Sequence, residues 1–258
     1  MNLDRRTITV SEIGCGSTAL AEARFIPQRY EPNYAYPLLV LFHGRGGNEE
    51  QLVSAMPSLS WRNYIGLSLR GPETIIRRNE RIGYSWGSTF ARPDRVNDFH
   101  TSSEQPGQAF RRIMAGSRLL PEERVEDATF SAIRNLRRTL HVNSERIFLV
   151  GVGEGAAVAY RLAFRYPERF AGVVAINGWL PARSLSRVRE CRSLKTLVVH
   201  GEWNERSSVE HTRRNVAVLK SGGLDVAFQA YPCGHRLTTP MLADVDTWLM
   251  RQNSSTIG

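Results

Sequence analysis

Short apolar runs alternate with segments of helical periodicity along most of the chain. The run Leu38–Phe42 is almost unbroken, as is typical of a strand covered on both faces of a parallel sheet. The same pattern predicts further strands at Thr7–Val10, Ala21–Ile26, Tyr64–Leu69, Ile147–Val150, Gly172–Ile176, Thr196–Val199 and Val226–Ala230. We expect the first two of these to form an opening antiparallel pair.

Four segments between or after the runs place apolar residues at helical spacing. They are Pro121–Leu140, Glu154–Tyr166, Ser208–Ser221 and Pro240–Met250. Strands that alternate with helices predict an α/β fold, with a mostly parallel sheet and helices on both faces. Ligands of such sheets bind beyond the carboxyl ends of the strands, so we expect the functional residues to follow the apolar runs directly.

We expect one domain over residues 1–258, a length that α/β folds reach as a single unit. Residues 85–120 are rich in Gly, Pro, Ser, Thr and mixed charge, and we expect an irregular excursion over the strand ends. Residues 253–258 are expected to be a frayed tail.

Composition narrows the class of protein. At 41% hydrophobic and 23% charged residues, the chain is typical of a globular protein. The net charge of +9 comes almost entirely from arginines spread along the sequence, which favours a solvated basic surface over a specific nucleic-acid site. The 3 cysteines, Cys15, Cys191 and Cys233, lie far apart and predict neither a disulfide framework nor a metal site.

We therefore expect no metal and no cofactor. The first residues carry no apolar segment of signal-peptide type, and no apolar run is long enough to span a bilayer. These features predict a cytoplasmic protein, and they are compatible with a homo-oligomer.

Loops with candidate chemistry follow four of the strands. They are His43–Gly47, Gly151–Gly155, His200–Asn204 and Tyr231–His235, and the intervening segments Asn143–Gly151, Tyr166–Val173 and Asn177–Pro181 accompany them. In this order, they resemble the α/β-hydrolase superfamily, and within it the phospholipase/carboxylesterase family, which includes acyl-protein thioesterase-like enzymes. The resemblance runs from Pro37 to the final helix.

The resemblance implies a changed catalytic triad. The family's Gly-x-Ser-x-Gly elbow matches Gly151, Gly153 and Gly155, so Gly153 occupies the position of the nucleophile and no acyl-enzyme can form there. Asn204 aligns with the acid, and His235 with the base. An amide cannot stabilise an imidazolium by charge, and the corresponding Asp-to-Asn change in a trypsin-like triad costs about 10⁴ in turnover.

Other parts of the site are expected to persist. The resemblance assigns the oxyanion hole to the backbone N–H groups of Arg45 and Glu154. The His43 ring is expected to brace the oxyanion loop. Three tryptophans near strand ends either line an apolar pocket or pack in the core: Trp86, Trp179 and Trp203.

Other residues are candidates to replace the missing nucleophile and the missing acid. Cys233 lies two positions before His235 and is a candidate nucleophile, although a small buried apolar role is favoured. Further candidate nucleophiles are Ser85, Ser207 and Ser208. Glu202 and Glu205 flank Asn204 and are candidate acids. Asn177 stands where some relatives place an alternative acid, but it is not acidic.

Three functions from different classes follow. We favour a catalytically impaired pseudo-hydrolase that retains a cleft for a small ester or acyl ligand. The second is an active carboxylic-ester hydrolase that uses a repositioned residue or water activated by His235. The third is an anion or nucleic-acid binder, which steep salt dependence of binding would distinguish from the other two.

Overall fold

The computed structural model describes residues 9–11, 20–59, 63–78, 80–87, 90 and 121–254. Its strands are β1 (Thr9–Ser11), β2 (Glu22–Phe25), β3 (Tyr36–Phe42), β4 (Ile65–Leu69), β5 (Glu73–Arg77), β6 (Glu80–Ser85), β7 (Val142–Val152), β8 (Gly172–Ile176), β9 (Lys195–Gly201) and β10 (Asp225–Tyr231). Its helices are α1 (Glu49–Val53), α2 (Met56–Leu59), α4 (Pro121–Arg137), α5 (Glu154–Arg165), α6 (Val209–Ser221), α7 (Thr239–Ser254) and the 3₁₀ segments η2 (Pro167–Arg169) and η3 (Ala182–Cys191).

Eight strands form one sheet in the order β1-β2-β4-β3-β7-β8-β9-β10. Neighbouring strands pair in parallel along the part of this order that runs β4-β3-β7-β8-β9-β10. Strand β2 runs antiparallel to both β1 and β4. The predicted α/β fold with a mostly parallel sheet is therefore confirmed. The opening antiparallel pair is present as well, although Thr7 and Ile8 lie outside the described residues.

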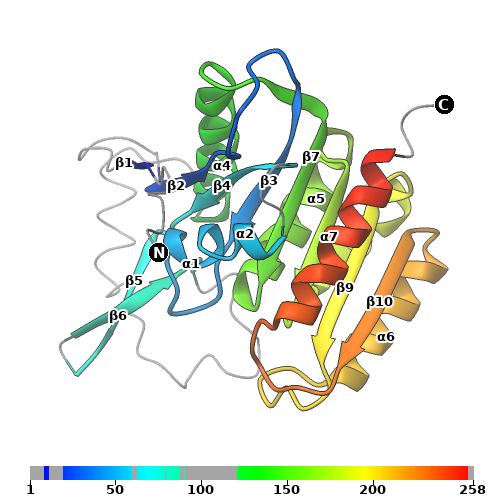
Figure 1. Cartoon of the computed structure of the whole chain (residues 1–258). Helices are drawn as coiled ribbons and strands as arrows, with labels where there is room; N and C mark the ends of the chain where they lie inside the picture. The colour runs from blue at the N-terminus through cyan, green and yellow to red at the C-terminus, as the bar shows by residue number, and fades with distance from the viewer. Residues whose placement is uncertain are drawn as a thin grey trace.

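Helices cover both faces of the sheet (Figure 1). The helices α4, α5 and α6 lie on one face, and α1, α2 and α7 lie on the other. Strand β3 is buried along its whole length because its alternate side chains serve two cores: Leu38 and Val40 pack beneath α5, and Leu39 and Leu41 beneath α7. Burial of each such leucine contributes roughly 2 kcal/mol, which explains why the run contains no polar residue.

Several elements differ from the sequence-based expectation. The hairpin β5–β6 was not predicted, because its half-exposed strands mix Glu, Thr and Arg with isoleucine. Strand β7 begins at Val142, five residues before the predicted Ile147, because Val142 already pairs with Tyr36, ahead of an irregularity in the register with β3. Helix α7 continues to Ser254, so the tail expected from Asn253 begins within a helix. Of the expected excursion, residues 88–89 and 91–120 lie outside the described part.

Strands β7 and β8 end at one level, and β9 runs two residues further, to Gly201. Val152 pairs with Ile176, and Ile176 pairs with Val199. The loops that follow these strands therefore emerge side by side at the carboxyl edge of the sheet, where ligands bind in α/β folds. Among the described residues, we find no helix that combines the length and the apolarity needed to cross a bilayer.

Candidate active site

Gly153 forms a sharp turn between β7 and α5. Its backbone angles are φ 57° and ψ −117°, and its N–H donates to the Ile176 carbonyl at 2.9 Å. Glycine adopts this left-handed region without the strain that a side chain would add. The flanking glycines are required for close packing: a Cβ on Gly151 would lie 2.2 Å from the Gly155 oxygen, and a Cβ on Gly155 would lie 2.1 Å from the Phe42 oxygen. The turn therefore has the backbone of a nucleophile elbow.

The His235 ring faces this turn from the loop after β10. A Cβ built on Gly153 would lie 3.4 Å from His235 Nε2 and 3.5 Å from Cε1, which is ordinary van der Waals contact. On the other side of the ring, Nδ1 lies 3.2 Å from Asn204 Oδ1. The structure thus brings together Gly153, His235 and Asn204, the residues that the sequence resemblance assigned to the nucleophile, base and acid positions.

The tautomer of His235 follows from its partner. Asn204 Oδ1 also accepts the Arg206 backbone N–H at 3.0 Å, which identifies that atom as the amide oxygen. An oxygen that accepts from Nδ1 requires a proton on Nδ1, so the neutral ring presents an unprotonated Nε2 toward Gly153.

Asn177 completes this polar cluster through contacts that the sequence analysis did not predict. It follows β8 directly with φ 52° and is 1% exposed. Its Oδ1 accepts from the Gly201 N–H at 2.8 Å and from Asn204 Nδ2 at 3.3 Å, and its Nδ2 donates to the Arg236 carbonyl at 2.9 Å. Asn177 therefore ties the loops after β8, β9 and β10 together. Its place directly after a buried strand, at a position where some relatives have an acid, was the signal that could have marked it.

His235 is a weak base in this setting. Its pKa is lowered to about 4, mainly by burial and also by the charges of Arg206 and His200, against an opposing effect of Glu205. The ring is therefore neutral at neutral pH. Neither candidate replacement acid takes the place of Asn204, since Glu202 and Glu205 are both exposed and Asn204 makes the contact with Nδ1.

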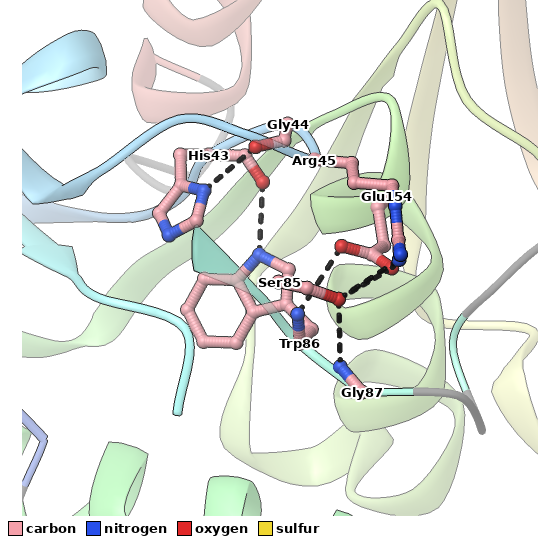
Figure 2. A network of polar contacts seen from close by, with 7 residues as sticks. All are labelled: His43, Gly44, Arg45, Ser85, Trp86, Gly87 and Glu154. Carbon is pink, nitrogen blue, oxygen red and sulfur yellow. Dashed lines mark hydrogen bonds and ion pairs between the residues drawn. The ribbon is translucent and has the colours of Figure 1, made fainter. Parts of the chain in front are cut away.

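A buried carboxylate anchors the start of α5 beside the loop that carries His43, Gly44 and Arg45 (Figure 2). The Glu154 side chain has no exposed area, and Arg45, from the loop after β3, pairs with it at 3.1 Å. Ser85 Oγ and the Trp86 N–H also donate to Glu154, at 3.0 and 3.1 Å. Burial raises the pKa of Glu154, whereas Arg45 and these hydrogen bonds oppose the rise. Glu154 therefore joins three chain segments instead of pointing into the site.

His43 braces the same loop, as expected. Its Nδ1 donates to the Gly44 carbonyl at 2.7 Å, and its Nε2 accepts the Gly71 N–H at 2.9 Å. Burial lowers its pKa to about 4, which keeps the ring neutral. The hairpin β5–β6 supports the loop from outside, because Tyr84 exchanges backbone hydrogen bonds with Gly46 and Gly47.

The three tryptophans lie in different environments. Trp86 is fully buried and its Nε1 donates to the His43 carbonyl at 2.8 Å, so it is a core residue and does not line an open pocket (Figure 2). Trp179 is partly buried and packs against the same core. Trp203 is 67% exposed on the loop that carries Asn204.

The candidate replacement nucleophiles have structural environments. Cys233 is buried in the apolar cluster beneath α7. Ser85 is fully buried and bonded to Glu154. Ser207 is buried with its Oγ 3.5 Å from the Gly178 carbonyl, and Ser208 caps the start of α6. Among the described residues, no hydrogen bond joins any of these side chains to His235.

The sheet, the elbow and the histidine loop together define an α/β-hydrolase fold. The carboxylesterase of Bacillus cereus shares this fold with a TM-score of 0.64 at 17% identity, over 90% of this chain and 93% of that one. The sequence profile described as Phospholipase/Carboxylesterase matches residues 30–253, and the chain belongs to this family.

Curated relatives match this chain over only part of their length. The chain is 25% identical over 137 residues to the carboxylesterase SOBER1 of Arabidopsis thaliana, an alignment that covers 49% of this chain and 60% of that protein. It is also 23% identical over 111 residues to a probable inactive carboxylesterase of Oryza sativa subsp. japonica, which covers 42% of this chain and 45% of that protein. The chain thus spans less than two thirds of these relatives.

Proposed function

We propose that the protein is a catalytically impaired member of the family, a pseudo-hydrolase that keeps a cleft for a small ester or acyl ligand. One observation carries the proposal: Gly153 has the backbone of the elbow and faces His235 Nε2, yet it has no side chain to attack a carbonyl. Covalent catalysis in this fold requires a nucleophile at that turn.

The acid position supports the same conclusion. Asn204 contacts His235 as an aspartate would, but its amide leaves an imidazolium without a compensating charge. A general base works best with a pKa near the operating pH, and the pKa of His235 is held near 4. We assign the oxyanion donors to the backbone N–H groups of Arg45 and Glu154, as the family resemblance implies.

The alternative is an active ester hydrolase that uses water activated by His235 or a displaced nucleophile. The low pKa of His235 makes it a poor activator of water. Cys233, the foremost displaced candidate, is buried in an apolar cluster. The name of the Oryza sativa relative agrees with an impaired branch of the family.

The test compares hydrolysis of a short-chain aryl ester by the parent protein, Gly153→Ser and Gly153→Ala. Serine and alanine add the same Cβ and the same backbone strain, so only the hydroxyl distinguishes them. We expect the parent and Gly153→Ala at background and Gly153→Ser at least tenfold above them, with the gain lost on further His235→Ala exchange. Removal of triad members in serine proteases leaves catalysis of about 10³–10⁴ over water, so weak parent activity alone is not decisive.

A parent activity that His235→Ala abolishes would contradict the proposal and establish the alternative. A Gly153→Ser protein that folds but stays at background would show that the cleft itself has changed, since the nucleophile and base would then both be present.

A further inference from the structure

We infer that His235 Nε2 is a fixed hydrogen-bond acceptor for the hydroxyl group of a neutral ligand, and that Asn177 is the positioning residue that sets it. This inference rests on the proposed function and adds a ligand class to it. It is carried by the polar cluster of Asn177, Asn204 and His235 at the carboxyl edge of the sheet.

The first step is the orientation of Asn177. Its oxygen accepts the Gly201 backbone N–H at 2.8 Å, and its amide nitrogen donates to the Arg236 carbonyl at 2.9 Å. A backbone N–H can only donate and a carbonyl can only accept, so the side chain has one orientation. Asn177 is 1% exposed, and water does not compete for either bond.

The second step is the identity of residue 204. Asn177 presents its oxygen to Asn204 Nδ2 at 3.3 Å and therefore requires a donor there. A carboxylate at 204 would place an oxygen against the oxygen of Asn177 in a site that is 6% exposed. The nearby His200 N–H gives little relief, because it already donates to the Ser207 carbonyl at 2.8 Å and lies 3.4 Å from Asn204 Nδ2. The cluster thus fits an amide at 204 and disfavours the acid.

The third step is the acceptor. With Asn204 oriented, its oxygen receives the proton of His235 Nδ1, and the lone pair of Nε2 faces Gly153. Among the residues that the structure describes, none bonds to Nε2. A ligand carboxylate or carbonyl oxygen placed there would meet a lone pair, whereas a hydroxyl would donate to it. Burial holds the pKa of the ring near 4, so the lone pair persists at neutral pH.

The space beside Gly153 suits a small group. A Cβ there has Nε2, Cε1 and the Gly44 Cα as nearest neighbours, all between 3.4 and 3.8 Å. A hydroxyl bound to a ligand carbon can therefore reach Nε2 without displacing the chain. A hydroxy ester combines this donor with a carbonyl for the proposed oxyanion donors, and it is the ligand class that we assign to the site.

The test uses a matched pair of probes, methyl 3-hydroxybutyrate and methyl butyrate, which differ in one hydroxyl. Binding is measured by NMR on the full chain with ¹⁵N-labelled histidine. We expect the hydroxy ester to bind about fivefold more tightly, the equivalent of about 1 kcal/mol for one net hydrogen bond. Its binding should shift the His235 Nε2 resonance to lower frequency, whereas methyl butyrate should leave that resonance in place.

Asn177→Ser tests the positioning role, because serine cannot reach both backbone partners. We expect the variant to populate the Nδ1–H tautomer of His235 less than the parent does, because only the Arg206 N–H then orients Asn204, and to show a smaller preference for the hydroxyl. Asn135→Ser, at an exposed position on α4, is the matched control and should keep both properties. If Asn177→Ser does not fold, the readout is the tautomer of His235 in the parent protein, which should carry its proton on Nδ1.

Equal affinity for the two probes, no binding of either, or a proton on Nε2 in the parent would each overturn the inference. Failure of the proposed function looks different, because it appears as methanol released from the esters in one-dimensional ¹H spectra of the same samples. A protein that hydrolyses both esters and still prefers the hydroxyl would refute the pseudo-hydrolase while the assigned ligand class stands.

Discussion

The buried histidine of the oxyanion loop makes acid stability a quantitative test of the structure. His43 is fully buried, and its two ring nitrogens are occupied as one donor and one acceptor. Its pKa is lowered from 6.5 to about 4. The unfolded chain therefore binds a proton near pH 6.5, whereas the folded protein binds it only near pH 4. Stability that is fully present above pH 6.5 is lost as the pH falls through this window.

The magnitude follows from linkage. A shift of roughly 2.5 pH units at about 1.36 kcal/mol per unit corresponds to about 3 kcal/mol of unfolding free energy lost on acidification. The perturbation is His43→Gln, which keeps an acceptor for the Gly71 N–H and removes the titration. The assay is urea unfolding at several values between about pH 7 and about pH 4.

We expect the parent to lose about 3 kcal/mol more than His43→Gln over this range. His235 and His200 titrate in both proteins, so the difference isolates His43. His211→Gln, at an exposed position on α6, is the matched control. Parallel curves for the parent and His43→Gln would refute the reasoning, because they would mean that the ring takes up its proton without cost in the folded state.

Three further predictions concern the same region. Arg45→Met should lower the unfolding free energy by about 3 kcal/mol at neutral pH, because it leaves the Glu154 carboxylate in the interior without its ion-pair partner. The loss should be smaller in acid, where Glu154 protonates, and a pH-independent loss in urea unfolding would contradict this. Gly153→Ala should cost about 1–3 kcal/mol through backbone strain alone, because its Cβ has room; a stabilised variant in thermal unfolding would show that the turn is not strained. Gly83→Ala should cost more than Gly153→Ala in the same scan, because its Cβ would lie 1.9 Å from the Gly46 oxygen; equal losses would mean that the hairpin separates from the loop freely.

The sequence predicted the parts of the fold whose burial is uniform. Strand β8 matches its predicted bounds, Gly172–Ile176, and α5 differs from Glu154–Tyr166 by one residue, because strands buried on both faces and amphipathic helices leave strong patterns. The hairpin β5–β6 leaves a weak pattern, since it pairs with itself at the edge of the molecule and exposes Ile76 and Ile82.

The candidate site likewise contains residues that the sequence predicted and residues that it did not. The loop residues Gly153, Asn204 and His235 were predictable as a set because the family resemblance aligns them with the nucleophile, acid and base positions, and the structure brings them together. The role of Asn177 was not predictable, because its partners come from the loops after β9 and β10 and depend on how three chain segments meet. The same holds for Glu154, whose partners Arg45 and Ser85 lie 109 and 69 residues away in the chain.

The common end level of β7 and β8 has a consequence for insertions and deletions. Gly153 and Asn177 follow paired residues, Val152 and Ile176, and both turn with positive φ, at 57° and 52°. One residue of strand corresponds to about 3.3 Å, more than the tolerance of any hydrogen bond in the cluster. A single-residue deletion within β8 would therefore pull Asn177 out of reach of Gly201, and it would also exchange the two faces of the strand. Surface loops tolerate insertions better than strands do, so the positions from which these loops start are set by the register of the sheet.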